Sequence, residues 1–401
     1  MRRSTALLLS CLCAPLAAIP AARAAFLVPG FELVYTAPVE TSLGQEELRS
    51  PVEVWPEMFA SAKKTIDLEE FYVTPKPGEP LEPALEALRK AGERGVRIRF
   101  LAEKNMAAAS AEGFERLRKI PNLELWVADF SALSPGGIIH AKYFVVDGVA
   151  AYVGSQNFDW RSLKHIHELG LRISDPEIVG RMRSVFETDW DAFGRLAAGK
   201  AVRPLNRRPL PAETGRRAYL VASPWPYAPP GVGDSETELA RLIGTAEREV
   251  RVQLLDYAPL DRRRLFYAPI DNALRLAASR GVRVRLMVSH WNTESPAVEH
   301  LKSLSLVPGV EVTVVTLPQS AQGRIPFSRV IHSKYMVLDG RTLWLGTSNW
   351  SGGYLDRSRN LEVVVKDEAL AGRVLKLHAQ LWDSAYAEKI DVAKAYPKPE
   401  R

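Results

Sequence analysis

Cysteine is almost absent from this chain of 401 residues, which has only Cys11 and Cys13, both close to the N-terminus. If the N-terminal segment is removed, the mature chain cannot form a disulfide. Beyond that segment, no stretch approaches 18 uninterrupted apolar residues, so we expect the mature chain to be soluble. With 46% hydrophobic and 25% charged residues, the composition is that of a globular protein and excludes a disordered one.

The N-terminal segment, residues 1–24, has the pattern of a secretory signal peptide. Arg2 and Arg3 precede an apolar run over residues 6–19, and Ala22, Arg23 and Ala24 form an A-x-A cleavage signal. An uncleaved N-terminal anchor is the alternative. We therefore predict export to the periplasm or the medium. The net charge of +6 falls to +3 without this segment, which suits an anionic substrate without identifying one.

One cassette of polar residues occurs twice. The order is His-x-Lys, four residues, Asp, six residues, Gly-Ser/Thr-x-Asn, with 17 residues from His to Asn and 192 residues between the copies. The first copy supplies His140, Lys142, Asp147, Ser155 and Asn157, and the second supplies His332, Lys334, Asp339, Thr347 and Asn349. A single His-x-Lys carries no information, whereas two copies with matched spacing indicate a duplicated functional unit.

The repeat extends beyond the cassettes, because Glu168 follows His140 by 28 residues and Glu362 follows His332 by 30. A period near 190 residues is too long for a solenoid and indicates two homologous domains. The predicted organisation is residues 1–24, signal peptide; 25–193, first domain; 194–217, a linker rich in Arg and Pro; and 218–401, second domain. Each half alternates strand and helix patterns with interior hairpins, which predicts an α/β (α+β) fold with mixed sheets covered by helices on both faces.

The cassettes fall on predicted hairpins, with strands over residues 138–146 and 330–338. Each contains Asp-Gly, the signal of a two-residue type I′ turn. A two-residue loop would place His140 opposite Ser155 and His332 opposite Thr347, with each His and Lys on one face. The same parity places Asp147 and Asp339 in the turns, so we interpret both as structural.

These residue types suit phosphodiester chemistry. Lys142 and Lys334 would neutralise phosphate oxygens, and Asn157 and Asn349 would donate hydrogen bonds to them. The two histidines would divide the nucleophile and general-acid roles. The remaining candidates are two carboxylates that could orient the imidazoles, Glu168 and Glu362, and two hydroxyls that could support the phosphate site, Ser155 and Thr347. One cassette supplies half a site, so the two domains must pair to complete it.

Together the paired cassettes resemble those of the phospholipase D superfamily over roughly residues 31–390. The resemblance implies two α-β-α sandwich domains related by a pseudo-twofold axis and a covalent phosphohistidine, without metal or other cofactor. The resemblance to the family implies that His140 is the nucleophile and His332 the general acid, although the symmetry of the site allows the reverse. Residues 154–163, 168–170, 264–271, 324–327 and 346–352 look like the branch of lysosomal phospholipase-D-like 5′ exonucleases, to which poxvirus envelope phospholipase-like proteins are similar.

We therefore predict a phosphodiesterase, favouring a 5′ exonuclease on single-stranded nucleic acid. The alternative is a phospholipase D or transphosphatidylase on glycerophospholipids, with transient membrane contact; a scaffold with a relic site is disfavoured by the intact cassettes. No obligate protein partner is indicated. Trp160 and Trp350 follow the cassette asparagines and could stack bases, or be buried structural residues. A metal at His165 and His167 is conceivable, but a polar loop is the favoured interpretation.

Overall fold

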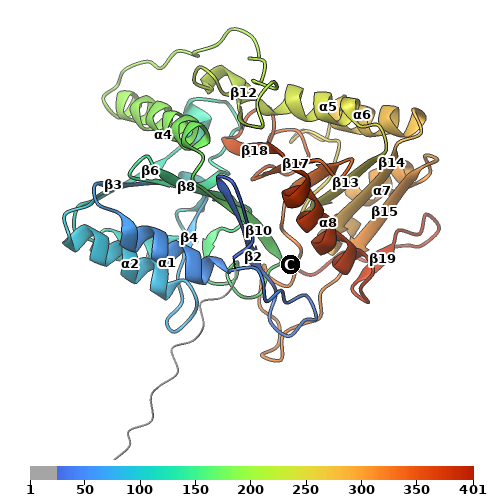
Figure 1. Cartoon of the computed structure of the whole chain (residues 1–401), viewed down its shortest axis with the longest axis horizontal. Coiled ribbons are helices and arrows are strands. Elements are labelled where there is room, and N and C mark those ends of the chain that lie inside the picture. Colours follow the sequence, from blue (N-terminus) through green and yellow to red (C-terminus); the bar gives the residue numbers. More distant parts are fainter. Residues whose placement is uncertain (1–24) are drawn as a thin grey trace, which may run out of the picture.

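Two mixed β-sheets, one from each half of the chain, form the framework of the computed structural model, which describes residues 25–401 (Figure 1). The predicted signal peptide lies outside the described residues. In spatial order, the first sheet contains β1 (Leu27–Val28), β2 (Phe31–Thr36), β10 (Glu168–Ile173), β8 (Ala150–Gly154), β7 (Lys142–Val146), β3 (Thr65–Glu70), β5 (Arg97–Glu103) and β6 (Leu123–Ala128). The second contains β12 (Gly233–Asp234), β11 (Ala218–Ser223), β18 (Asn360–Lys366), β17 (Thr342–Gly346), β16 (Tyr335–Leu338), β13 (Glu249–Leu254), β14 (Arg283–Ser289), β15 (Val310–Val315) and β19 (Ala387–Lys389).

Helices cover both faces of each sheet (Figure 1). The first half has α1 (Pro51–Ser61), α2 (Glu82–Glu93), α3 (Ala111–Leu117) and α4 (Pro176–Ala197), and the second has α5 (Ser235–Thr245), α6 (Ala268–Ser279), α7 (Ala297–Ser305) and α8 (Glu368–Trp382). A short pair of strands, β4 (Val73–Thr74) and β9 (Phe158–Asp159), lies outside both sheets. The predicted α/β architecture with duplicated, mixed sheets is therefore confirmed.

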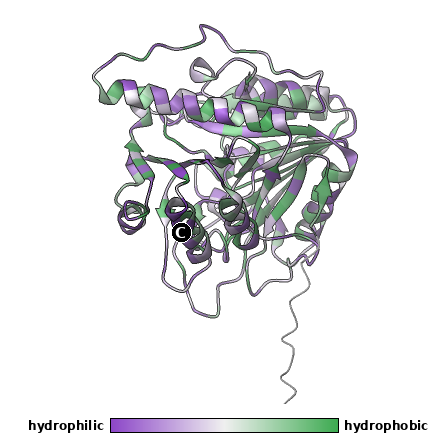
Figure 2. Ribbon diagram, turned by 60° about the vertical axis from the view of Figure 1, so that its left-hand side comes forward, coloured by the Kyte–Doolittle hydropathy of each residue, from purple (hydrophilic) through white to green (hydrophobic). Residues whose placement is uncertain are grey.

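The two halves share one hydrophobic core. Apolar side chains of β2, β7, β8, β10 and α4 form a continuous buried cluster with those of β11, β16, β17, β18 and α8. Separate clusters lie beneath α1 and α2 and beneath α5 and α6. Figure 2 shows the same division, with largely apolar strands inside and helices that are apolar on one side. Burying apolar surface from both halves in one core fixes their relative position, which a site shared between them requires.

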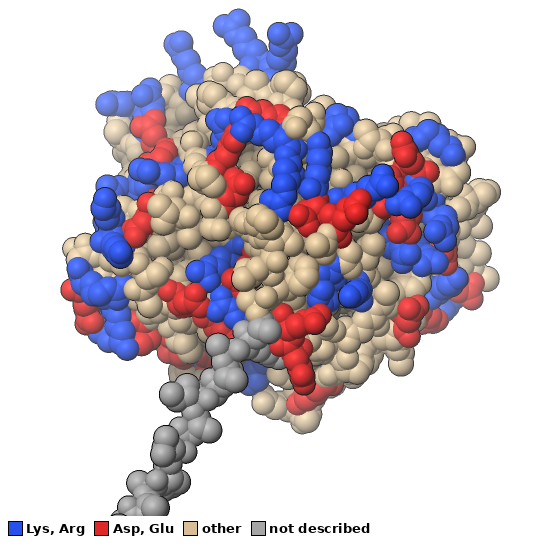
Figure 3. Space-filling view, in the orientation of Figure 1, with Lys and Arg blue, Asp and Glu red and all other residues tan. Residues whose placement is uncertain are grey.

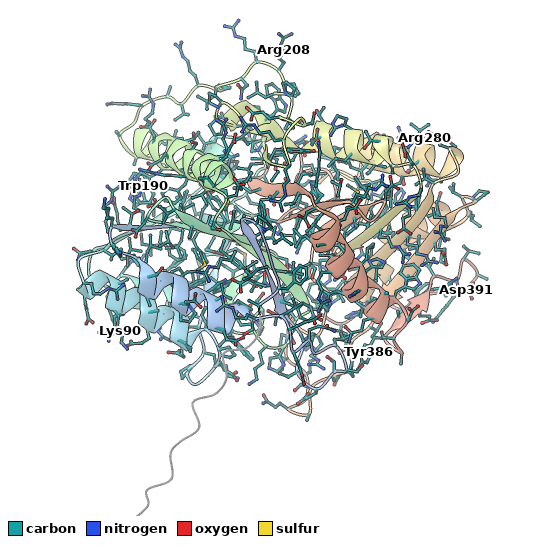
Figure 4. All side chains as sticks on the ribbon, viewed as in Figure 1. Lys90, Trp190, Arg208, Arg280, Tyr386 and Asp391 are labelled. Atoms are coloured by element: carbon teal, nitrogen blue, oxygen red, sulfur yellow. The ribbon has the colours of Figure 1, made fainter. Side chains whose placement is uncertain are left out.

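The segment between the halves carries positive charge. It runs from the end of α4 at Ala197 to the start of β11 at Ala218 without regular structure, and the predicted linker lies mostly within it. Lys and Arg side chains project from this region in Figure 3, and Arg208 points away from the body of the protein in Figure 4. Elsewhere on the face shown in Figure 3, positive and negative side chains are interspersed.

The register of both hairpins differs from prediction by one residue. Val146 pairs with Ala150 and Leu338 with Thr342, so neither His140 nor His332 faces the predicted hydroxyl. Asp147 and Gly148 do have positive φ values, 52° and 67°, as a type I′ turn requires. The shift arises because the residue after each Asp-Gly pair stays in the loop, which lengthens it to three residues.

Candidate active site

Each His-x-Lys segment lies at the start of a central strand, next to the opposite half of the protein. Strand β7 begins at Lys142 and β16 just after Lys334, so the predicted strands over 138–146 and 330–338 are shortened at their starts. The backbone N–H of His140 donates to the carbonyl of Arg359 at 2.9 Å, and that of His332 donates to the carbonyl of His167 at 2.8 Å. Each histidine is thus attached to a segment of the other half rather than to its own sheet.

The two histidines and two lysines of the cassettes converge in one buried site. His140, Lys142, His332 and Lys334 are 4%, 1%, 7% and 0% exposed. Each lysine Nζ donates to the carbonyl of the histidine two residues earlier, at 2.6 Å for Lys142 and 2.7 Å for Lys334. Burial lowers the pKa of Lys334 to about 7. Burial and then the charge of Lys334 lower the pKa of Lys142, so the two ammonium groups are close enough to repel one another and would be relieved by an anion.

The two imidazoles have different partners, each supplied by the other half. His332 Nδ1 lies 2.9 and 2.8 Å from the two carboxylate oxygens of Glu168. His140 Nδ1 lies 2.9 Å from Oδ1 of Asn360. Asn360 is fixed in orientation because its Oδ1 also accepts from Thr347 at 2.9 Å and its Nδ2 donates to the carbonyl of Tyr354 at 3.0 Å.

Both acceptors require a proton on Nδ1, which leaves Nε2 of each neutral imidazole as an acceptor or nucleophile. Neither Nε2 atom has a hydrogen-bond partner within residues 25–401. Burial, and then the neighbouring lysine charges, lower the pKa of His140 well below its usual range. Burial also lowers the pKa of His332, to about 4, but there the Glu168 carboxylate acts in the opposite direction.

The prediction that Glu362 orients an imidazole is wrong. Its carboxylate accepts hydrogen bonds from the hydroxyls of Ser235 and Ser348, and burial raises its pKa to about 7. The position equivalent to Glu168 is held by Asn360, which follows His332 by 28 residues, the same spacing that separates Glu168 from His140. Matching the residues by equal spacing rather than by carboxylate type would have identified Asn360.

Each cassette asparagine has a side-chain oxygen without a hydrogen-bond partner, whereas the cassette hydroxyls are already hydrogen-bonded. Oδ1 of Asn157 and of Asn349 is buried without a hydrogen-bond partner in the described chain, and Nδ2 of Asn349 lies 3.4 Å from Asp256 Oδ2. Ser155 Oγ donates to the carbonyl of Leu169 at 3.2 Å and accepts from its N–H at 3.0 Å. Thr347 donates to Asn360, as described above. The two hydroxyls therefore hold the strands that carry the imidazole partners and support the site indirectly.

The cassette aspartates brace the hairpins. The Asp147 carboxylate accepts from the backbone N–H groups of Lys63, Lys64 and Thr65 at 2.8, 2.7 and 2.8 Å. Asp339 accepts equivalent bonds from residues 247–249 at 3.0, 2.8 and 2.9 Å. Both carboxylates lie at the far end of the hairpins from the histidines, as the structural interpretation of these residues requires.

The aromatic side chains at the site are not the two that were proposed to stack bases. Trp350 is 1% exposed and packs edge-on against Trp344, and Trp160 is 8% exposed beneath Nζ of Lys76. Neither ring offers an open face, because residues that directly follow the cassettes turn into the core. Instead, the half-buried rings of Phe71 and Tyr354 flank His140, with centroids 5.1 and 4.7 Å from its imidazole.

Two acids next to the lysines, one buried and one half-buried, have no counterpart in the repeated pattern. Glu70 is 2% exposed, and burial raises its pKa despite the nearby charge of Lys142. Burial also raises the pKa of Asp256, which the charge of Lys334 opposes. Sequence comparison of the two halves gives no signal for either, because no acid occupies the equivalent position of the other half.

His165 and His167 do not form a metal site with other residues. His167 Nδ1 lies 2.9 Å from Gln253 Nε2 and 3.2 Å from Ser333 Oγ, within the shared core. His165 is fully buried against Trp160. Within residues 25–401, no group of three or more His, Cys, Asp or Glu side chains comes together in a way that could hold a metal ion. In the same part of the chain, no helix is long and apolar enough to cross a membrane.

The fold and the site define a duplicated α/β protein whose halves contribute matching histidine, lysine and asparagine side chains to one buried, cationic centre. The family is identified by the sequence. This chain belongs to the phospholipase D-like family, because the family described as "Cardiolipin synthase, PLD-like domain" matches residues 56–190 and 239–382.

Known proteins of similar sequence and structure agree with this assignment. "Phospholipase D Z" of Dictyostelium discoideum is 30% identical over 377 residues, which cover 87% of this chain and 88% of that protein. "5′-3′ exonuclease PLD3" of Bos taurus is 30% identical over 379 residues, covering 86% and 77%. The solved phosphatidylserine synthase of Haemophilus influenzae Rd KW20 has 14% identity and a TM-score of 0.58 over 84% of this chain and 85% of that one, which supports the fold alone.

Proposed function

We propose that this protein is a phosphodiesterase that forms a covalent phosphohistidine and removes nucleotides from the 5′ ends of single-stranded nucleic acid. The observation that carries the proposal is the pair of imidazoles, each with Nδ1 held by an acceptor from the other half and Nε2 left free beside two buried lysines. Two histidines poised in this way can act on opposite sides of one phosphorus atom.

In the first step, His140 Nε2 attacks phosphorus while the bond to the leaving oxygen breaks. That oxygen takes the proton from Nε2 of protonated His332. In the second step, water attacks the phosphohistidine, gives its proton to His332 Nε2, and the P–N bond breaks. The phosphate monoester leaves, and both imidazoles return to their starting states.

The different partners of the two imidazoles support this division of roles. A carboxylate stabilises an imidazolium cation, so Glu168 favours the protonated form of His332 that a general acid needs. An amide oxygen gives His140 the same tautomer without that charge, so His140 stays neutral as a nucleophile must. Binding of an anionic phosphate between the lysines would raise both histidine pKa values and increase the protonated fraction of His332.

The non-bridging oxygens of the phosphodiester would be bound by Lys142, Lys334, Asn157 and Asn349. The lysines are buried, so their attraction for phosphate is little screened by water, and the two asparagine side chains add hydrogen-bond donors as charge moves onto those oxygens.

Single-stranded nucleic acid is the favoured substrate because the relatives named 5′-3′ exonuclease cover most of this chain. The relative named phospholipase D makes a glycerophospholipid the second candidate. The two substrates share every catalytic group, so only a direct comparison separates them. We further propose that residues 1–24 direct export, which N-terminal sequencing of protein recovered from the periplasm or medium would test.

Purified protein should be offered a 3′-labelled single-stranded oligonucleotide and phosphatidylcholine in parallel. We expect progressive shortening of the oligonucleotide from its 5′ end and no release of choline. A circular single strand should remain intact, and its cleavage would indicate an endonuclease. Release of choline with the oligonucleotide left intact would instead support the lipid function. His140→Ala and His332→Ala serve as controls, and wild-type rates in either would contradict the mechanism.

A further inference from the structure

A pocket of about 330 Å³ opens next to the second cassette. The residues that line it and matter here are Asp256, Arg264, Trp291, Glu294, Ser351 and Arg401. Trp291 lies in the short helix η4 (His290–Thr293), at the end of β14. No residue of either cassette lines the pocket, so it is distinct from the phosphate site described above.

The pocket is nevertheless continuous with that site. Asp256 Oδ2 lies 3.4 Å from Asn349 Nδ2, and its charge acts on Lys334. Ser351 follows Asn349 by two residues along the chain. A group covalently joined to a phosphate held by Lys334 and Asn349 would therefore be directed into this pocket.

The ring of Trp291 contacts both buried apolar side chains and more exposed groups. It packs against the buried side chains of Ile166, Leu255 and Val330. Its other contacts include the guanidinium of Arg401, 5.6 Å from the ring centroid, and the ring of Phe327 at 6.4 Å. A flat, delocalised group thus already rests on this indole, while Phe327 is 57% exposed at the edge of the arrangement.

The charges of the pocket select the kind of group that fits. Asp256 and Glu294 offset the charges of the two arginines, so the lining has no net positive charge for a second phosphate, and both carboxylates can accept hydrogen bonds from amino groups. Two carboxylates and two arginines also make the lining unsuitable for a hydrocarbon chain. A nucleobase has the two properties required, a flat apolar face and polar N–H groups at its edge.

We propose that this pocket binds a nucleobase of the substrate, stacked on Trp291, from one of the two nucleotides joined by the scissile phosphate. The proposal rests on the proposed function. Arg401 leaves the ring when the base enters. Its ion pair with Glu294, at 2.9 Å, joins side chains that are 49% and 32% exposed, so it opposes displacement only weakly.

The test compares a normal 5′-hydroxyl oligonucleotide with two versions that lack the base at the first or the second position. For the wild type, loss of the stacked base should raise KM by roughly 5- to 100-fold at one of these positions, as expected for one base–aromatic stack. In Trp291→Leu, which keeps an apolar side chain against the packed neighbours but removes the aromatic face, normal and abasic substrates should have nearly equal KM. Trp291→Phe should restore most of the difference.

Trp126→Ala is the matched control, since Trp126 is a half-buried tryptophan on β6 of the first sheet, packed against Trp190. We expect it to keep the wild-type ratio of KM values. Arg401→Ala should lower KM for the normal substrate, because the ring then has no competing occupant. Melting temperatures establish that each variant is folded, and Trp291→Met, which also lacks an aromatic face, replaces Trp291→Leu as the decisive variant if the latter unfolds.

Equal KM for normal and abasic substrates in the wild type, or an unchanged ratio in the folded non-aromatic variant of Trp291, would overturn the base-binding role of the pocket while leaving the exonuclease function intact. Wild-type protein that cleaves phosphatidylcholine and leaves every oligonucleotide whole would instead overturn the proposed function and the pocket with it.

Discussion

Glu168, from the first half of the chain, accepts a hydrogen bond from Nδ1 of His332, in the second half, at 2.8 Å. The relationship is mirrored by Asn360 and His140, with the roles of the halves exchanged. Neither half therefore contains a complete histidine with its partner. A site built in this way is active only when the halves are correctly paired, and the single carboxylate makes its two histidines chemically different.

Replacing the two candidate carboxylates separately should distinguish them. Glu168→Gln removes the charge that stabilises protonated His332, so we expect kcat to fall by roughly 10²-fold or more. Glu362→Gln should lower kcat less than tenfold, because Glu362 bonds to Ser235 and Ser348 and contacts neither imidazole. Steady-state kinetics on one oligonucleotide measure both. Equal losses would contradict the assignment of Glu168 alone as an imidazole partner.

Trapping the intermediate should identify the nucleophile. His332→Asn removes the general acid, so cleavage of an oligonucleotide should nearly stop. A nitrophenyl diester, whose leaving group needs no proton, should still react once and stop at the phosphohistidine, because His332 is also missing as the base of the second step.

Mass spectrometry after a rapid quench that preserves phosphohistidine should then locate the phosphoryl group on His140. The matched variant His140→Asn should give no burst and no labelled residue. A burst in His140→Asn, with the label on His332, would reverse the two roles.

Activity should be highest at acid pH. Burial lowers the pKa of both histidines from the ordinary value of ~6.5, that of His332 to about 4. The rate should therefore fall with increasing pH as His332 loses its proton, and Lys334, with a pKa of about 7, loses its charge at higher pH still. Bound phosphate raises the pKa of both histidines, so we expect the optimum of kcat, measured at saturating substrate, at about pH 4–6, with limbs that belong to the coupled pair. A rate that keeps rising above pH 8 would exclude a protonated histidine as the acid.

Chelation should leave the reaction unaffected. The lysine ammonium groups and asparagine amides already supply the positive charge and hydrogen-bond donors that a divalent cation would otherwise contribute. Rates in excess EDTA should equal those in buffer within twofold. Loss of activity that Zn²⁺ or Mg²⁺ restores would contradict this prediction.

The sequence predicted those features that depend on repetition and local pattern. Two copies of the cassette predict two similar domains and one shared site. Asp-Gly predicts turns with positive φ, which Asp147 and Asp339 adopt. These inferences succeed because they concern residues close together in the chain.

The features that were missed depend on contacts between distant segments. The extra loop residue shifts each hairpin by one position, which pattern alone does not specify. The pattern does not single out Asn360, because it leads one to expect a carboxylate. It leaves open whether Trp350 stacks a base or is buried, because its burial against Trp344 depends on how the sheet packs. Trp291, 41 residues before His332, reaches the site only through the end of β14.

The ion pair between Asp189 and Arg359 should be essential for pairing the halves. Asp189 on α4 accepts hydrogen bonds of 2.6 and 2.7 Å from Arg359, whose carbonyl holds His140, and both side chains are fully buried. Asp189→Asn removes the carboxylate that is hydrogen-bonded to the buried guanidinium and leaves only Glu69 to offset its charge, so we expect a loss of about 3–5 kcal/mol in stability, measured by calorimetry. Asp189→Leu combined with Arg359→Met removes both charges and should recover most of that loss.

The double variant should nevertheless have low kcat, because Arg359 also donates to the carbonyls of Ser223 and Tyr227 and so fixes the segment that positions Asn360 against His140. A single variant as stable as the wild type, or a double variant with full activity, would contradict this role.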